Sequence, residues 1–295
     1  MNVTRILPGT RPDADIYALT DSRLSLGRSL EEVASALLGA GVRILQYREK
    51  EMDGGEMLEQ CRLLRRLTRD ASACLIIDDH VDIALLCGAD GVHVGQTDIP
   101  VPDVRALVGP DMIIGLSTHS PDQARAAAAA GADYIGVGPI FATRTKRNVC
   151  APVTLDYLDW VAGNISLPFV AIGGIKEHNI AEVARHGAKC CALVSELVGA
   201  PDIAARVAAV RAAMHAHDAD APAFRNMEGR GAARAGGSVE YGPPRSVLLS
   251  KVSAAGDPVF RPAGFTLPPE RPQVNCGCPA SRFQSRPARL KQSIS

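Results

Sequence analysis

Residues 120–137 read SPDQARAAAAAGADYIGV and contain one complete helix-to-strand unit. Ser120 can cap the start of the helix, and Gln123 can close a capping box. Gly131 suits the end of the helix, because a residue without a Cβ adopts positive φ without penalty. The apolar run Tyr134–Val137 follows at once and is typical of a buried parallel strand. The stretch therefore predicts a helix that leads directly into a strand.

The same unit recurs along the chain, with glycine phrases at 39–41, 88–90 and 187–189. The predicted strands are Ile16–Leu19, Ile44–Tyr47, Leu75–Asp78, Gly91–Val94, Ile113–Leu116, Tyr134–Val137, Phe169–Ile172 and Cys191–Val194. Eight strands, each followed by a helix, in about 200 residues predict an α/β fold of the (β/α)8 TIM-barrel type. A doubly wound open sheet is the alternative, but no G-x-G-x-x-G motif follows the first strand.

The C-terminal quarter differs in composition from the rest. Residues 221–295 hold 11 Lys+Arg against 4 Asp+Glu and half of the 20 prolines, without helical or strand periodicity. Such a segment cannot bury enough apolar surface to offset its conformational entropy. We therefore expect a folded domain over residues 1–216 and a low-complexity, disordered extension over 217–295. The extension is either a basic arm for an acidic partner or dispensable, and the second is favoured.

The composition also limits the partners and the compartment. Lys+Arg and Asp+Glu both number 32, so zero net charge gives no support for a nucleic-acid partner. No apolar run approaches the roughly 18 residues of a spanning helix. The N-terminal residues lack the apolar core of a signal peptide. We expect a cytoplasmic protein that acts on small molecules, with homo-oligomerisation left open.

Candidate site residues follow the predicted strands, where barrels place their chemistry. After the second strand, alternation puts Gln46, Arg48 and Lys50 on one side. One amide and two cations at a barrel mouth suit a polyanion such as diphosphate. A solvated, charged strand exit is the structural alternative.

Carboxylates follow the next two strands. Asp78 and Asp79 end the third, and Asp98 follows the fourth. Mg²⁺ takes one or two carboxylates and completes its shell with water and phosphate oxygens, so Asp79 and Asp98 are candidate ligands. The alternative is local: Asp79 could cap the helix from Val81, and Asp98 could begin a turn. Nothing in the sequence assigns His80 or His93 a catalytic or ligand role, so packing or surface roles are favoured.

A second anion site is predicted on the other side of the mouth. Thr143, Thr145 and Lys146 lie on a loop after the sixth strand, while Gly173-Gly174 and Ser195 follow the seventh and eighth. Barrels often bind a phosphate between the last two loops. Two anion sites across one mouth suggest that two phosphorylated substrates are joined with diphosphate as the leaving group.

In order, these motifs resemble the thiamine phosphate synthase family. The matches span residues 16–196 and are Gln46-x-Arg48-x-Lys50, Asp79, Gly91-Val92-His93-Val94-Gly95-Gln96-x-Asp98, Gly115-Leu116-Ser117-Thr118-His119, Gly138-Pro139-Ile140-Phe141-x-Thr143-x-Thr145-Lys146, Ala171-Ile172-Gly173-Gly174-Ile175 and Val194-Ser195.

The resemblance implies a Mg²⁺-dependent transferase. It would condense 4-amino-2-methyl-5-hydroxymethylpyrimidine diphosphate with 4-methyl-5-(2-hydroxyethyl)thiazole phosphate, giving thiamine phosphate and diphosphate by a dissociative substitution. The residues implied for the pyrimidine diphosphate are Gln46, Arg48, Lys50, Ser117 and Lys146, of which the last four would be catalytic, with Tyr17 lining the pyrimidine pocket. Those implied for the thiazole phosphate are Thr143, Thr145, Gly174, Val194 and Ser195, and those implied for Mg²⁺ are Asp79 and Asp98.

Two positions depart from the family pattern. Asp78 stands where the family usually has Asn, so its contact with substrate is open, and Ala142 replaces the usual Pro in the loop. Two other functions remain as alternatives: a thiazole tautomerase-like barrel that joins nothing, and a non-catalytic thiamine-precursor sensor. A tautomerase would be expected to lack the diphosphate and metal groups that are present here.

Overall fold

The computed structural model describes residues 5–143, 145 and 150–219. Residues 220–295, which hold nearly all of the predicted extension, lie outside the described residues, as does Lys146. The chain divides into two units at Met227–Glu228, and the described elements all belong to the first. In the described part of the chain, no helix combines the length and hydropathy needed to cross a membrane.

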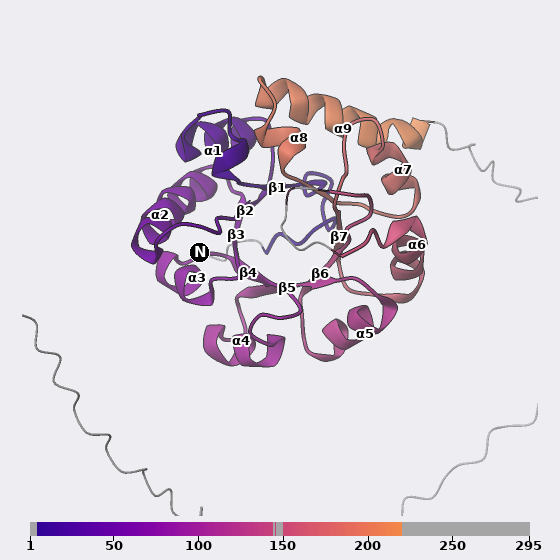
Figure 1. Cartoon of the computed structure of the whole chain (residues 1–295), viewed down its shortest axis with the longest axis horizontal. Coiled ribbons are helices and arrows are strands. Elements are labelled where there is room, and N and C mark those ends of the chain that lie inside the picture. The colour runs from indigo at the N-terminus through magenta and orange to yellow at the C-terminus, as the bar shows by residue number, and fades with distance from the viewer. Residues whose placement is uncertain (1–4, 144, 146–149, 220–295) are drawn as a thin grey trace, which may run out of the picture. The chain divides into compact units, whose positions relative to one another are not determined.

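The first unit is a closed barrel of parallel strands in sequence order, and helices surround it (Figure 1). The strands are β1 (Ile16–Leu19), β2 (Ile44–Tyr47), β3 (Cys74–Asp78), β4 (Gly91–Val94), β5 (Ile113–Thr118), β6 (Tyr134–Val137), β7 (Phe169–Ile172) and β8 (Cys191–Leu193). The helices are α1 (Leu30–Gly39), α2 (Gly54–Asp70), α3 (Val81–Cys87), α4 (Val101–Val108), α5 (Pro121–Ala129), α6 (Thr154–Asn164), α7 (Ile180–Arg185), α8 (Ser195–Val198) and α9 (Ile203–Ala219), with a 3-10 turn η1 (Ser22–Leu24). The predicted (β/α)8 barrel is confirmed.

Strand positions agree with the sequence within two residues. β3 begins one residue earlier than expected, β5 runs two residues further, and β8 ends one residue sooner. The strands could be located this closely because parallel strands that are buried on both faces consist almost entirely of apolar residues, so they stand out in the sequence as short apolar runs.

Helix ends follow the expected glycine chemistry. Gly88, Gly131 and Gly187 have φ values of 65°, 83° and 93°, in the left-handed region. Ser120 caps α5 by accepting from the Gln123 N–H. The capping box is incomplete, however, because the Gln123 side chain accepts from the His119 N–H instead, at 2.7 Å.

The strands separate two apolar layers. Their outward side chains pack against the helices in one large cluster. The inward side chains form a smaller cluster in the barrel lumen, which includes Tyr17, Ile76 and Tyr134. Because side chains alternate along a strand, each lumen residue points the same way as the residue two positions later. The polar residues two positions after these lumen residues therefore also point inward, at the carboxyl-terminal mouth of the barrel.

Candidate active site

The cationic exit of β2 is built as the alternation predicts. Gln46 and Arg48 are buried, and Arg48 retains only 8% of its exposure. The Arg48 backbone N–H donates to Thr20 Oγ1 at 3.0 Å, and its Nη1 lies 3.4 Å from Asp21 Oδ2. Asp21 is 1% exposed and caps η1, so it is itself fixed. This anchor was missed by sequence reasoning, because nothing in Thr20-Asp21-Ser22 says that Asp21 faces the next strand.

The two carboxylates after β3 lie against these cations. Lys50 Nζ is 2.7 Å from Asp78 Oδ2 and also contacts Asp79, while Arg48 Nε lies 3.7 Å from Asp78 Oδ2. Burial alone would lower the Lys50 pKa, but Asp78 and Asp79 raise it above its usual value. Lys50 therefore stays positively charged through the neutral range.

The backbone turns sharply at Asp79. Its φ is 61°, and its N–H donates to the His93 carbonyl at 2.8 Å. Asp tolerates this left-handed conformation better than most side chains. The N-cap of α3 is His80, without a side-chain bond to the helix. The helix-capping alternative for Asp79 is therefore not realised, and its carboxylate points to Lys50 instead.

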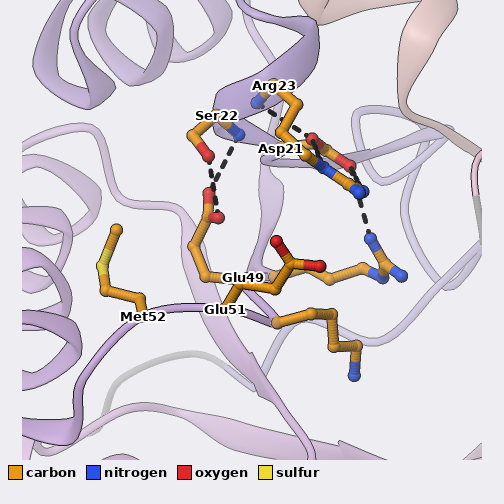
Figure 2. A pocket seen from close by; sticks show the side chains of 8 residues that line it. Asp21, Ser22, Arg23, Glu49, Glu51 and Met52 are labelled. Atoms are coloured by element: carbon orange, nitrogen blue, oxygen red, sulfur yellow. Dashed lines mark hydrogen bonds and ion pairs between the residues drawn. The ribbon is translucent and has the colours of Figure 1, made fainter.

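A cavity of about 210 Å³ lies beside these cations. The loops after β1 and β2 line it with Asp21, Ser22, Arg23, Arg48, Glu49, Lys50, Glu51 and Met52. Figure 2 shows the hydrogen bonds between the residues that line it. Asp21 accepts from Arg23 and Arg48, and Glu49 accepts from the Ser22 N–H and hydroxyl. Arg48 and Lys50 are thus presented on a wall braced by its own ion pairs.

Asp98 lies in the exposed turn after β4. Its Oδ2 accepts from the Gly95 N–H at 2.7 Å, so the turn-forming alternative is realised for one oxygen. Among the described residues no group of three or more His, Cys, Asp or Glu side chains could hold a metal ion. A donor set of two carboxylates suits Mg²⁺ only if water and substrate oxygens supply the other ligands. The Asp79 and Asp98 carboxylates fit that requirement in their chemistry.

A series of buried side-chain hydrogen bonds in the barrel lumen connects three of the predicted site residues, Tyr17, Gln46 and Ser117. Gln46 Nε2 donates to Tyr17 Oη at 2.9 Å, and Tyr17 Oη lies 2.9 Å from Tyr134 Oη. His93 Nδ1 lies 2.9 Å from Tyr134 Oη, and His93 Nε2 lies 2.9 Å from Ser117 Oγ. These hydrogen bonds thus link Gln46 and Ser117 across the barrel through Tyr17, Tyr134 and His93, and sequence reasoning did not select the last two.

The loop after β6 is tied to the end of β7. The Ile140 N–H donates to the Ile172 carbonyl at 2.9 Å, and the Phe141 N–H donates to the Gly173 carbonyl at 3.0 Å. Gly174 has φ 65°, and a Cβ there would lie 2.7 Å from the Ala142 carbonyl oxygen. Only glycine fits this close approach, so the Gly-Gly turn has a structural reason beyond turning the chain.

The remaining thiazole-phosphate candidates lie in the loop after β6 and directly after β8. Thr143 Oγ1 accepts from the Thr145 N–H at 3.3 Å within the β6 loop. Val194 is the N-cap of the short helix α8, and Ser195 is its first residue. β7 and β8 are paired neighbours in the barrel, so their loops leave from adjacent positions. Among the described residues, no hydrogen bond joins Thr143 or Ser195 to Gly174.

Fold and site together define a TIM-barrel enzyme whose polar and charged groups gather at the carboxyl ends of its strands. A family model described as thiamine monophosphate synthase matches residues 16–197. The chain belongs to the thiamine monophosphate synthase family, a family of transferases in thiamine biosynthesis. The family predicted from the sequence is therefore confirmed.

Individual relatives agree. The thiamine-phosphate synthase of Lawsonia intracellularis is 60% identical over 209 residues, which are 71% of this chain and 96% of that protein. That of Pelotomaculum thermopropionicum is 62% identical over 200 residues, 68% of this chain and 92% of that one. The solved thiamine phosphate pyrophosphorylase from Pyrococcus furiosus superposes with a TM-score of 0.63 at 35% identity, covering 70% of this chain and 97% of its own.

Proposed function

We propose that this transferase condenses 4-amino-2-methyl-5-hydroxymethylpyrimidine diphosphate with 4-methyl-5-(2-hydroxyethyl)thiazole phosphate. The C–O bond to diphosphate breaks, and its electron pair leaves with the diphosphate oxygen. The thiazole nitrogen then supplies its lone pair to the pyrimidine-methyl cation, forming a C–N bond and thiamine phosphate. The observation that carries the proposal is the braced pair of cations, Arg48 and Lys50, at the mouth of a barrel of this family.

The cations have the main chemical task in this proposal. Preorganised positive charge stabilises a leaving diphosphate as its negative charge develops. Arg48 is held by Asp21, and Lys50 keeps its proton because of Asp78 and Asp79. Lys146, named from the sequence, would add a third cation. Asp79 and Asp98 would hold Mg²⁺, which would neutralise further diphosphate charge when bound.

The other candidates are proposed to bind and orient. Tyr17 and Gln46 would line the pyrimidine pocket, and Ser117 would donate to the diphosphate-bearing substrate. The proposed thiazole-phosphate ligands are Thr143, Thr145, Gly174, Val194 and Ser195. The support for this half is the close-fitting Gly-Gly turn after β7, the strand that pairs with β8, since backbone N–H groups at glycine turns can approach a phosphate closely. Asp78 would act indirectly, through Lys50.

The barrel is proposed to carry the whole activity. The Lawsonia relative is covered over 96% of its length by 209 residues, fewer than the 219 that end with α9. A chain truncated after Ala219 should therefore keep full turnover. The cut belongs there rather than at the predicted boundary of 216, because α9 continues to Ala219. Loss of activity in that truncated chain would give residues 220–295 a role.

The decisive experiment mixes both precursors with the purified full-length chain and Mg²⁺. Diphosphate should be released only when both precursors and the ion are present, and thiamine phosphate should appear in equal amount. Chelation with EDTA should stop the reaction, and excess Mg²⁺ should restore it. Conversion of the thiazole phosphate without the pyrimidine would instead indicate a tautomerase-like enzyme. Binding of both precursors without product would indicate a sensor.

A further inference from the structure

The polar chain in the barrel lumen exists because two strands leave space for it. A Cβ at Gly115 would lie 2.2 Å from Tyr134 Cζ and 2.4 Å from His93 Nδ1. A Cβ at Gly136 would lie 3.3 Å from His93 Cε1. Asp78, His93, Gly115 and Tyr134 are successive register partners across four neighbouring strands. The two rings therefore meet over a gap that only glycine at position 115 provides.

Both tyrosines of the hydrogen-bonded series in the lumen keep their protons. Tyr17 and Tyr134 are 2% and 1% exposed. Burial raises the pKa of Tyr17 well above its usual value, and burial also raises the pKa of Tyr134. Each hydroxyl therefore brings one proton into the lumen, and a buried hydroxyl proton without an acceptor is costly.

The order of donors follows from one end of the chain. Gln46 Nε2 donates to Tyr17 Oη, so the Tyr17 proton needs another acceptor. Among the described residues, the partner left to Tyr17 is Tyr134 Oη, at 2.9 Å. The Tyr134 proton must then go to His93 Nδ1, also at 2.9 Å.

This order fixes the state of the last two members. A ring nitrogen that accepts at Nδ1 leaves the imidazole proton on Nε2. His93 Nε2 thus donates to Ser117 Oγ, 2.9 Å away. The Ser117 oxygen accepts the hydrogen bond from His93, so the Ser117 hydroxyl proton points away from His93 and can be donated to another acceptor. No second partner for the Ser117 hydroxyl occurs among the described residues.

We propose that Tyr134 and His93 are positioning residues that hold the Ser117 hydroxyl as a hydrogen-bond donor toward the diphosphate-bearing substrate. This inference rests on the proposed function, in which Ser117 contacts that substrate. The lumen chain sets the direction of a single hydroxyl at the mouth. A hydroxyl free to accept as well as donate would point its oxygen lone pairs at an anion for part of the time. The fixed order removes that repulsive orientation before the substrate arrives.

The tautomer of His93 tests the order without any turnover. In ¹⁵N-histidine-labelled full-length protein, Nδ1 of His93 should give the shift of an unprotonated, accepting nitrogen, and Nε2 that of an N–H. In the Tyr134→Phe variant the Nδ1 signal should move, because its donor is gone. A proton on Nδ1 with a bare Nε2 in the wild-type protein would overturn the proposal. The resonance is assigned by its loss in His93→Gln.

A double-mutant cycle tests whether the effect passes through Ser117. Tyr134→Phe keeps the ring and removes one hydroxyl, so kcat with both precursors should fall roughly 3–10-fold, the range of one hydrogen bond. In a Ser117→Ala background the same change should have less than about a twofold effect, because coupled residues are non-additive. Tyr157→Phe is the matched control. The buried Tyr157 hydroxyl donates to Thr118 Oγ1 and is not part of the series that runs from Gln46 to Ser117. This control variant should leave kcat nearly unchanged in both backgrounds.

The outcomes separate this inference from the proposed function. If the wild-type chain makes no thiamine phosphate from the two precursors, the proposed function fails, while the histidine tautomer can still be read. If the wild-type chain is active but Tyr134→Phe costs the same with and without Ser117, the positioning role is wrong. An equal loss in Tyr157→Phe would show a packing effect and would also overturn it.

Discussion

Lys50 Nζ lies 2.7 Å from Asp78 Oδ2, and the same oxygen lies 3.7 Å from Arg48 Nε. The Asp78 carboxylate therefore lies directly against the two cations proposed for the diphosphate. Its charge is compensated, which explains how it can be tolerated beside an anion site. The cost is that Asp78 competes with the substrate for Lys50.

Replacing Asp78 by Asn should leave kcat/KM unchanged or raise it by up to about tenfold, since one competing charge near the substrate is worth on the order of 1 kcal/mol. The isosteric amide keeps the side-chain shape. The KM for the pyrimidine diphosphate should carry the change, measured by diphosphate release at fixed thiazole phosphate. A severe loss of turnover, with normal folding, would instead show that Asp78 is a metal ligand.

Replacing Asp98 by Ala should lower Mg²⁺-dependent turnover about 100-fold or more, the usual cost of removing a group that stabilises developing charge. Binding of the thiazole phosphate should be nearly unaffected, as calorimetry would show. Asp98 also accepts from the Gly95 N–H, so Asp98→Asn is needed alongside. That variant keeps an acceptor for the turn but loses the charge, and it should be as inactive as Asp98→Ala. Equal loss of both binding and turnover would contradict two separate anion sites.

The barrel could be predicted because its signals are local. Each strand is a short apolar run, and the glycines before several strands mark helix ends within a few residues of the chain. Positions on one strand, such as Gln46 and Arg48, follow from alternation alone. The same local reasoning could not choose between the alternatives for Asp79 and Asp98. In the structure Asp79 contacts Lys50, and one carboxylate oxygen of Asp98 accepts a hydrogen bond within the turn after β4.

Local sequence patterns could not predict contacts between residues that are far apart in the sequence. His93 and Tyr134 are 41 residues apart, and Asp21 and Arg48 are 27 apart. Their pairing depends on barrel register, which no pattern within either strand specifies. A usable signal was present at Gly115, an isolated glycine inside a predicted strand. Such a glycine often marks the close approach of another group.

Gly174→Ala should weaken thiazole phosphate binding and also destabilise the fold. Its φ of 65° costs a side chain roughly 1–2 kcal/mol, and the added Cβ would meet the Ala142 carbonyl oxygen and Phe141 Cβ, both at 2.7 Å. Gly131→Ala is the matched control, since Gly131 has φ 83° with nothing within 4 Å of the added Cβ. Urea unfolding should show the backbone penalty in both variants. Only Gly174→Ala should raise the KM for thiazole phosphate, and a similar rise in the control would remove the close-approach argument.

His119 should control the start of the β6 loop. Its Nδ1 lies 2.5 Å from the Gly138 carbonyl oxygen, so the ring must donate there. His119→Ala should raise the KM for thiazole phosphate roughly 3–10-fold, since one hydrogen bond that holds the loop is lost. His119→Asn places an amide donor close to the Nδ1 position and should recover most of the loss. Equal defects in the Ala and Asn variants would mean that ring packing, rather than the hydrogen bond, matters.

Asp15 should make the fold sensitive to acid. It is 2% exposed, and it accepts from Arg211 Nε at 2.7 Å and lies 3.1 Å from His215 Nε2, which ties α9 to the start of β1. Burial alone would raise the Asp15 pKa, but the bonds from Arg211 and His215 bring it below its usual value. A carboxyl whose folded pKa is lowered stabilises the fold above the unfolded pKa of about 4. That stabilisation is lost as pH falls through the folded pKa.

Asp15→Asn should therefore lower the free energy of unfolding by about 1.5–3 kcal/mol at pH 7, the range for hydrogen bonds to a charged group. The gap between wild type and variant should shrink as pH falls below about 4, because the Asp15 carboxyl is then protonated first in the unfolded chain and, at lower pH, also in the folded protein. Urea titrations followed by circular dichroism at several pH values measure both effects. Asp111→Asn, at an exposed loop position, should change neither. A gap that stayed constant down to pH 3 would show that packing, rather than the Asp15 charge, supports α9.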